Sequence, residues 1–437
     1  MATPSPSISN PAPDRALDLT VTLHRPIYED MPTPQQAYVL FEAMPTANAP
    51  AASQPVNFSL VLDRSGSMAG EKLQQLKAAA NWVVDHLGVS DILSVVIFDE
   101  IADVVVPAGP VDDPIALMQR ISKIEERGGT HMSSGMHAGL GELQRNQATG
   151  RVCRMLLLTD GQTLEDQTNC EGLADQCRAA GIPINVMGLG VGEQGNWDPR
   201  FLESLAQRSG GEWTIIDTPE NASSAFANIL QEMQGAAVTN ASLTIRYVAG
   251  LEPRAVWRVV PLIGRLSHSA VGERDIQVFL GDIQHKVGQS LLAEVLLPVR
   301  QPGAFRLMQA DIAYDIPASS PGNVLHRAGH QVSVDVIFPF TADPQQAQQA
   351  DSRLLNMLER VVAHKLQTQA LDEAAAGDVK RATVRLRAAA TRLLDLGEAD
   401  MAEQALQQAQ QMEQGGQIDA AAAQQMRYAT KKLADST

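Results

Sequence analysis

Hydrophobic and polar residues follow two different periods along this chain. Between residues 55 and 236, short apolar runs typical of buried strands alternate with stretches whose apolar residues recur every three or four positions, as on one face of a helix. The first apolar run ends in Asp63, and a helical pattern begins at Glu71. Strands that alternate with helices in this way predict a doubly wound, mainly parallel sheet that is covered by helices on both faces.

The individual elements of this α/β unit follow from the same pattern. Strands are expected at residues 56–62, 92–98, 101–106, 152–159, 182–189 and 212–216. Helices are expected at residues 71–87, 114–124, 133–143, 171–180, 199–209 and 220–233. This order of elements is that of a Rossmann-like fold.

The segments on either side of the α/β unit show the two-residue period of strands with one buried face. Apolar residues alternate with polar ones near residues 17–23, 241–247, 276–280, 308–314 and 332–338. Short alternating strands between Gly and Pro turns indicate an antiparallel β-sandwich. The two early strands, at 17–23 and 37–44, cannot form a stable sheet alone. We therefore expect them to complete the sandwich, with the α/β unit inserted into it.

The last part of the chain is helical in pattern. It is rich in Ala, Gln, Leu and Glu, and glycines at 377, 397 and 415–416 divide it at helix-length intervals. Three or four helices are expected, either as a helical cap or dimerisation element or as a repeat-like platform for a partner. The expected organisation is a disordered tail (1–14), N-terminal sandwich strands (15–54), the α/β domain (55–236), the rest of the sandwich (237–342) and a helical C-terminal domain (343–437).

Charge and cysteine content narrow the classes of function and location. A formal net charge of −16 argues against nucleic acid as a partner and against adhesion to an anionic membrane. Residues 1–14 lack the pattern of a secretory signal, and the strongest apolar run, 291–299, has only the length of a strand. Cys153, Cys170 and Cys177 form no C-x-x-C pair, which suits packed thiols in a reducing compartment. We therefore expect a cytoplasmic protein without membrane insertion.

Three segments place oxygen-bearing side chains where strands of the expected sheet end. Asp63, Ser65 and Ser67 follow the first strand as D-x-S-x-S, Thr130 follows a Gly-Gly pair ahead of a helix, and Asp160 follows the strand at 152–159. In an open α/β sheet these segments meet at the rim where the strand order reverses. Two carboxylates and three hydroxyls are hard ligands, which suit Mg²⁺ far better than zinc.

This pattern resembles the von Willebrand factor type A domain with a metal-ion-dependent adhesion site, over about residues 56–234. In that family the first loop carries D-x-S-x-S, the second a Thr and the third an Asp, and this chain has all five residues. The resemblance implies direct metal contacts from Ser65, Ser67 and Thr130, with Asp63 and Asp160 often acting through water. It also implies an open metal position for an Asp or Glu of a protein partner. Mg²⁺ is the expected ion, with Mn²⁺ or Ca²⁺ as alternatives, and a relic or purely structural metal site is the opposing interpretation.

Residues around the motif leave some questions open. In the related integrin β domains, the residues after the second Ser supply carboxylates for an adjacent ion, whereas here they are Met68-Ala69-Gly70, so one metal is expected. His131 either tunes partner choice at the rim or satisfies the start of a helix. Arg64 is either a specificity contact or a solvated surface residue. The flanking segments are similar in architecture to inter-α-trypsin inhibitor heavy chains and to bacterial type A proteins, in which a β domain accompanies the type A domain.

Enzyme motifs are missing from the sequence. It has no G-x-S-x-G, H-E-x-x-H or phosphate-binding G-x-x-x-x-G-K motif, and the glycine-rich run 188–192 leads into no immediate helix. No catalytic or cofactor-binding residue is expected. The first hypothesis is a non-catalytic, Mg²⁺-dependent protein interaction module. The alternatives are a regulatory or adaptor subunit of an ATP-driven complex of the chelatase or MoxR type, whose ATPase is a separate chain, and a metal-dependent hydrolase.

Overall fold

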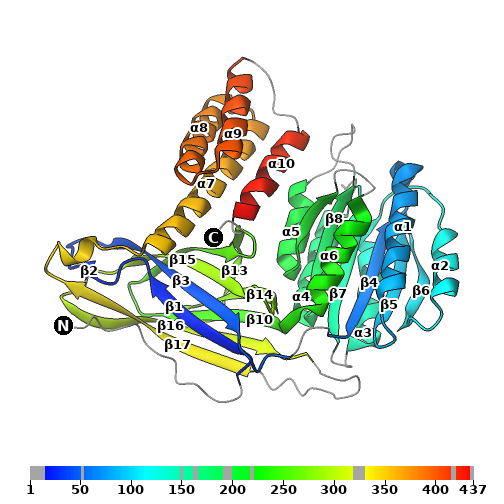
Figure 1. The fold of residues 1–437 in the computed structure, drawn as a ribbon, viewed down its shortest axis with the longest axis horizontal. Coiled ribbons are helices and arrows are strands. Elements are labelled where there is room, and N and C mark those ends of the chain that lie inside the picture. The colour runs from blue at the N-terminus through cyan, green and yellow to red at the C-terminus, as the bar shows by residue number, and fades with distance from the viewer. Residues whose placement is uncertain are drawn as a thin grey trace.

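The computed structural model describes residues 15–50, 54–147, 151–160, 166–189, 199–216, 221–317, 330–414 and 420–433. The chain forms an α/β unit, a two-sheet β-sandwich and a helical array above the sandwich (Figure 1). The expected disordered tail at 1–14 lies outside the described residues, as do residues 51–53.

The α/β unit contains a six-stranded sheet with the order β6-β5-β4-β7-β8-β9. All neighbours are parallel except β6, which pairs with β5 in the antiparallel direction at the edge. The strands are β4 (Val56–Asp63), β5 (Ile92–Phe98), β6 (Ala102–Pro110), β7 (Val152–Thr159), β8 (Ile184–Leu189) and β9 (Trp213–Ile216). Every residue of β4 and of β7 is buried, because helices cover both faces of the sheet.

Six helices flank this sheet. They are α1 (Glu71–His86), α2 (Pro114–Ser122), α3 (Met132–Arg145), α4 (Gln167–Ala180), α5 (Pro199–Ser209) and α6 (Ala222–Gln234). Leu60 and Leu62 of β4 share a core with α1, α2 and α6, whereas Val61 shares one with α3, α4 and α5. Helix α3 lies especially close to the sheet, since a Cβ atom on Gly139 would come within 2.5 Å of Val61 Cγ2. This close approach fixes the loop that leads into α3 over the ends of β4 and β5.

The sandwich is assembled from strands on both sides of the α/β unit in the sequence. One sheet has the order β1 (Leu17–Leu23), β3 (Gln35–Pro45), β15 (Gln289–Leu297), β11 (Glu252–Val260) and β12 (Gly264–Leu266). The other has the order β13 (His268–Ala270), β14 (Asp275–Gln284), β10 (Ala236–Tyr247), β16 (Gly303–Asp315), β17 (His330–Thr341) and β2 (Tyr28–Glu29). The pairing of β3 with β15 confirms that early and late strands share a sheet. One detail of the antiparallel expectation is wrong, because the short strand β2 runs parallel to β17.

The α/β unit is connected to the sandwich by two chain segments that lie side by side. The backbone N–H of Gln54, just before β4, donates to the carbonyl oxygen of Gln234 at the end of α6, at 3.0 Å. Strand β10 of the sandwich then begins at Ala236. The chain therefore enters and leaves the α/β unit at the same place.

The helical array consists of α7 (Ser352–Ala375), α8 (Val379–Asp395), α9 (Ala399–Glu413) and α10 (Ala420–Lys431). Its core continues into the first sandwich sheet through Leu40, Trp257 and Leu292, so the helices lie on that sheet as a cap (Figure 1). Helix α10 also reaches the α/β unit, where Lys431 Nζ lies 2.5 Å from Glu203 Oε1 of α5. The expected fold class, a Rossmann-like α/β domain with a sandwich and a helical C-terminal domain, is confirmed.

The structure also bears on the expectations for the three cysteines and for membrane-spanning helices. Cys153, Cys170 and Cys177 are all buried and free, and burial raises the pKa of the Cys153 and Cys177 thiols to about 12, so they are packed, unreactive groups. Over the described ranges, no helix has both the length and the apolar character needed to cross a membrane.

Candidate metal site

Asp63 forms the buried floor of the candidate site. It ends β4, and its carboxylate accepts two hydrogen bonds, from the backbone N–H of Ser65 at 2.8 Å and from Thr159 Oγ1 at 2.6 Å. Burial raises the pKa of Asp63 to about 6; the hydrogen bonds from Ser65 and Thr159 oppose this rise, and the charge of Asp160 adds to it. The ionised carboxylate is therefore held in a fixed orientation in a place that favours a nearby cation.

The two serines of the first loop lie beside one another. A 3-10 turn at Gly66–Met68 is anchored by the fully buried Met68, and it brings Ser65 Oγ within 3.1 Å of Ser67 Oγ. Two hydroxyl oxygens thus occupy neighbouring positions directly above the end of β4.

Asp160 comes from the neighbouring strand. Strand β7 pairs with β4 in parallel register, with Leu158 opposite Leu62, so Asp160 leaves the sheet at the same edge as Asp63. Asp160 is only 7% exposed, and its buried Oδ1 atom has no hydrogen-bond partner among the residues that the structure describes. An unpaired, buried carboxylate oxygen next to a second carboxylate is the donor arrangement that a bound cation would satisfy.

The loop that carries Thr130 is hydrogen-bonded to the first loop. The backbone N–H of Gly66 donates to Gly128 O at 3.0 Å, and that of Arg127 donates to Arg64 O at 2.8 Å. Thr130 follows two residues after Gly128 and is half-buried. Four of the expected side chains are therefore clustered at one edge of the sheet, and the fifth lies on a loop that is bonded to the same rim.

Two segments of the chain match known protein families. Residues 57–231 match the von Willebrand factor type A domain, and residues 352–436 match the Sll0103-like, C-terminal alpha-helical domain. The chain contains a von Willebrand factor type A domain.

Relatives share parts of this architecture. The Synechocystis protein sll0103 is 31% identical over 62% of this chain, and inter-alpha-trypsin inhibitor heavy chain H3 of Rattus norvegicus is 27% identical over 43% of it. The chain spans 64% of the length of the first relative and 22% of the second. A von Willebrand factor type A structure from Catenulispora acidiphila has a TM-score of 0.78 and 18% identity, with 98% of this chain and 99% of that chain covered. At this identity the likeness to the solved structure shows the fold alone.

Arg64 connects the first loop of the type A domain to the next strand. Its side chain is only 12% exposed, its Nε donates to Asp99 Oδ2 at 2.6 Å, and a second nitrogen lies 3.0 Å from Asp103 Oδ2. The interpretation of Arg64 as a solvated surface residue is therefore wrong, whereas its role as a specificity contact stays a prediction. A lone arginine in the motif does not reveal the ion pair with Asp99, because this partner lies 35 positions away.

His131 occupies the N-cap position of α3, but its side chain does not cap the helix. Asp166 performs that task, since its Oδ2 accepts a 2.5 Å hydrogen bond from the backbone N–H of Ser133. His131 Nε2 lies 3.4 Å from Asp166 Oδ1, and the imidazole is 51% exposed at the rim. The alternative in which the His131 side chain satisfies the helix start is wrong, and its role in partner choice at the rim stays a prediction. Asp166, which caps the helix, is a residue that sequence reasoning missed.

Two other residues around the site were also missed. Thr159 orients Asp63, and its place directly before Asp160 was the available signal. Lys72 of α1 places its ammonium nitrogen 3.5 Å from Asp160 Oδ2. Of the glycine-rich run 188–192, residues 190–192 lie outside the described residues.

Proposed function

We propose that this protein is a non-catalytic interaction module whose type A domain holds Mg²⁺ through Asp63, Ser65, Ser67, Thr130 and Asp160 and captures an acidic side chain of a protein partner. The observation that carries this proposal is the buried, unpaired Oδ1 atom of Asp160 beside the buried carboxylate of Asp63. The matched family, whose members generally serve as protein interaction modules, supports the same conclusion.

Each residue has a role that follows from its chemistry. Ser65, Ser67 and Thr130 offer neutral hydroxyl oxygens, while Asp63 and Asp160 supply the negative charge that holds a divalent cation. When bound, Mg²⁺ would supply a positive charge that the neutral hydroxyl ligands only partly compensate. A coordination position would remain open to a carboxylate of the partner. Thr159 keeps the Asp63 carboxylate oriented, and Arg64 keeps the first loop against β5.

The arrangement of polar groups argues against hydrolysis. A serine nucleophile needs a general base within hydrogen-bond reach. The hydroxyl of Ser65 instead contacts that of Ser67, and the imidazole at the rim, His131, faces Asp166. These contacts favour binding over catalysis at this edge of the sheet.

Metal binding is tested first, with Mn²⁺ as a spectroscopic substitute for Mg²⁺. The full chain is titrated with Mn²⁺ and free ion is measured by electron paramagnetic resonance. Ser67→Ala is expected to weaken binding by about tenfold or more, because one ligand is lost. Ser269→Ala, on an exposed strand of the sandwich, is the matched control. Equal Mn²⁺ affinity in all three proteins would contradict the assigned ligand set.

Partner capture is tested with the same variants. Wild-type protein on beads is expected to retain a partner in Mg²⁺ and release it in EDTA, and Ser67→Ala is expected to retain none. A partner that stays bound in EDTA would rule out metal-mediated capture. A retained ATPase whose turnover changes with this chain would instead support the adaptor role.

A further inference from the structure

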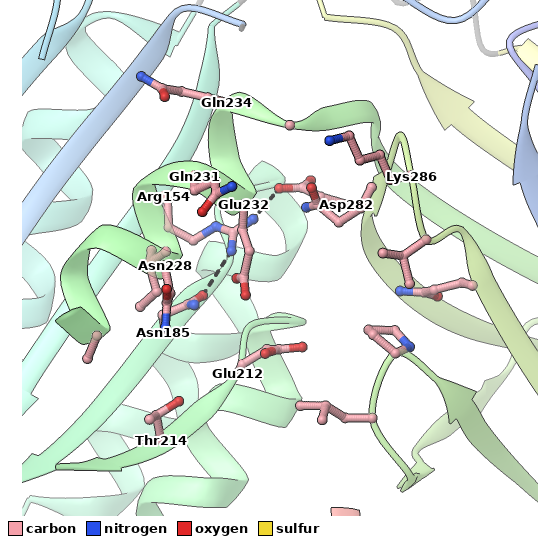
Figure 2. A pocket seen from close by; sticks show the side chains of 18 of the residues that line it. Arg154, Asn185, Glu212, Thr214, Asn228, Gln231, Glu232, Gln234, Asp282 and Lys286 are labelled. Carbon is pink, nitrogen blue, oxygen red and sulfur yellow. Dashed lines mark hydrogen bonds and ion pairs between the residues drawn. The ribbon is translucent and has the colours of Figure 1, made fainter. Parts of the chain in front are cut away.

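A cleft of about 830 Å³ lies between the α/β unit and the sandwich (Figure 2). Its lining includes Arg154 and Asn185 at the amino ends of β7 and β8, Glu232 of α6, Arg258 of β11 and Asp282 of β14. The candidate metal loops are at the carboxyl ends of the same sheet, so the two sites are at opposite ends of the α/β unit. A cleft of this size between two structural units has the dimensions of a small-molecule site.

The arginines that line the cleft are already engaged. Arg154, whose side chain is 6% exposed, contacts Asn185 Oδ1 at 3.1 Å and forms an ion pair with Asp282 across the boundary between the two units. Arg258 lies 3.7 Å from Glu212 Oε1, and its Nε donates to the carbonyl oxygen of Leu262 at 3.2 Å. Each guanidinium thus has its own acidic partner.

Glu232 is the acidic residue left over. Figure 2 marks no hydrogen bond or ion pair between its carboxylate and the other residues drawn, although the side chain is largely removed from solvent. Burial raises the pKa of Glu232 to about 7; the charge of Glu212 adds to the rise, while Arg154 and Arg258 oppose it. Lys286 and Lys432, which also line the cleft, are both exposed, so water screens their charges and weakens their attraction for Glu232.

Hydrogen-bonding groups surround this carboxylate. Asn228 and Gln231 precede Glu232 on α6 by four and one positions, and both line the cleft with it. Thr214 of β9 lines it from the sheet side. Figure 2 shows the carboxylates of Glu212 and Glu232 directed into the same open space. A ligand there would meet the Glu232 carboxylate, the nearby Glu212 carboxylate and several neutral donors and acceptors.

We propose that this cleft binds a small organic cation, through an alkylammonium or guanidinium group that pairs with the Glu232 carboxylate. Such a group supplies several N–H donors to one ionised acceptor, which makes a strong charge-assisted hydrogen bond in a partly desolvated place. The net charge of −16 favours the approach of cations from solution. The site is independent of the proposed metal function, because it uses none of the same residues.

The test compares ligands of equal length that differ in charge. Putrescine and butanediol are titrated into the full chain by calorimetry in the presence of EDTA, and a third titration uses the capped peptide acetyl-Lys-Lys-Lys-amide. Putrescine binding with no butanediol binding is expected. A response to the peptide alone would support the same cation site and identify a protein side chain as its source. No binding of either cation, or equal binding of the diol, would overturn the proposal.

Variants assign the binding to Glu232. Glu232→Gln keeps the shape of the side chain and is expected to weaken putrescine binding about tenfold or more, as for the loss of one charge-assisted hydrogen bond. Glu273→Gln, an exposed glutamate of the sandwich, is the matched control. In wild-type protein, the side-chain amide resonances of Asn228 and Gln231 are expected to shift with putrescine. Unchanged affinity in Glu232→Gln would overturn the assignment, and unchanged binding in Ser67→Ala would separate this cleft from the metal loops.

Discussion

The ammonium nitrogen of Lys72 lies 3.5 Å from Oδ2 of Asp160. Lys72 belongs to the first turn of α1, so the contact links the helix that follows the D-x-S-x-S loop to the loop that follows β7. It places a cation of the protein itself beside the candidate metal ligands. The same positive charge that balances Asp160 therefore competes with a metal ion for that carboxylate.

Replacing this lysine is expected to strengthen metal binding. In Lys72→Met the repulsion between the ammonium and a divalent ion is lost, and Mn²⁺ affinity should rise about fivefold, equivalent to roughly 1 kcal/mol in a partly exposed place. Lys77→Met on the same helix, which removes only a contact to Ser122 O, is the control. Weaker Mn²⁺ binding in Lys72→Met would mean that the lysine supports the site and does not compete with it.

The ion pair between Arg64 and Asp99 is expected to hold the first loop in place. Arg64→Met leaves the Asp99 carboxylate, only 1% exposed, without its main counter-charge, and should lower the free energy of unfolding by about 2–3 kcal/mol. Chemical denaturation measures this loss. Because Asp99→Asn removes the stranded charge, the double variant Arg64→Met/Asp99→Asn should recover part of the stability, and a purely additive double variant would contradict the pairing.

His364 predicts that stability falls in mild acid. Burial, with the charges of Lys431 and Arg427, lowers the pKa of His364 to about 3, and its ring contacts Thr430 Oγ1 at 2.9 Å. In the unfolded chain, the imidazole of His364 binds a proton near pH 6.5. The contribution of neutral His364 to the free energy of unfolding is therefore fully present above that pH and decreases as the pH falls toward 3. At pH 5 the loss should be about 2 kcal/mol.

The variant His364→Gln separates the pH-dependent contribution of His364 to stability from that of the other histidines. The unfolding free energy of His364→Gln is expected to change less between pH 7 and pH 5 than that of wild type, with the exposed His268→Gln as control. His24, whose pKa burial lowers to about 4, should remain in both proteins as a second acid-sensitive group of similar effect over this pH range. Identical pH profiles for wild type and His364→Gln would contradict the prediction.

Glu232 predicts the opposite pH trend at the cleft. Because its folded pKa of about 7 lies above the ordinary 4.5, its contribution to stability is greatest below pH 4.5 and is lost as the pH rises through 7. At pH 8, Glu232→Gln should therefore raise the free energy of unfolding by about 1 kcal/mol, which thermal unfolding would show as a higher midpoint temperature. The gain should disappear at pH 5, and a loss of stability at pH 8 would show that the carboxylate has a partner.

The sequence predicts the buried α/β elements best. Strand β7 and helix α5 have the expected bounds, because an apolar run broken only by Arg154 marks the strand and a clear helical stripe marks the helix. The sandwich was harder to predict, and β11 was missed. Val256 of β11 faces the sandwich core, but Trp257 and Val259 pack under the helical cap, so the two-residue alternation is lost. A pattern rule cannot anticipate a layer supplied by residues 352–433.

At the candidate site, spacing along the sequence identifies the candidate ligands but not the residues that support them. Asp63, Ser65 and Ser67 are recognisable because local spacing fixes their place at a strand end. Lys72 and Asp166 act through side-chain contacts between segments that are far apart in sequence, and their residue types are common on any protein surface. Such contacts depend on the packing of whole helices, which a single sequence does not specify.

The hydrogen bond between Gln54 and Gln234 has a mechanical consequence. A partner that pulls on the rim with the candidate metal site would load both connections to the sandwich at once, at the far end of the sheet from the point of attachment. The α/β unit should then tilt as a rigid body on this paired stalk, and the boundary that opens or closes as it tilts is the one that contains Arg154, Asp282 and Glu232.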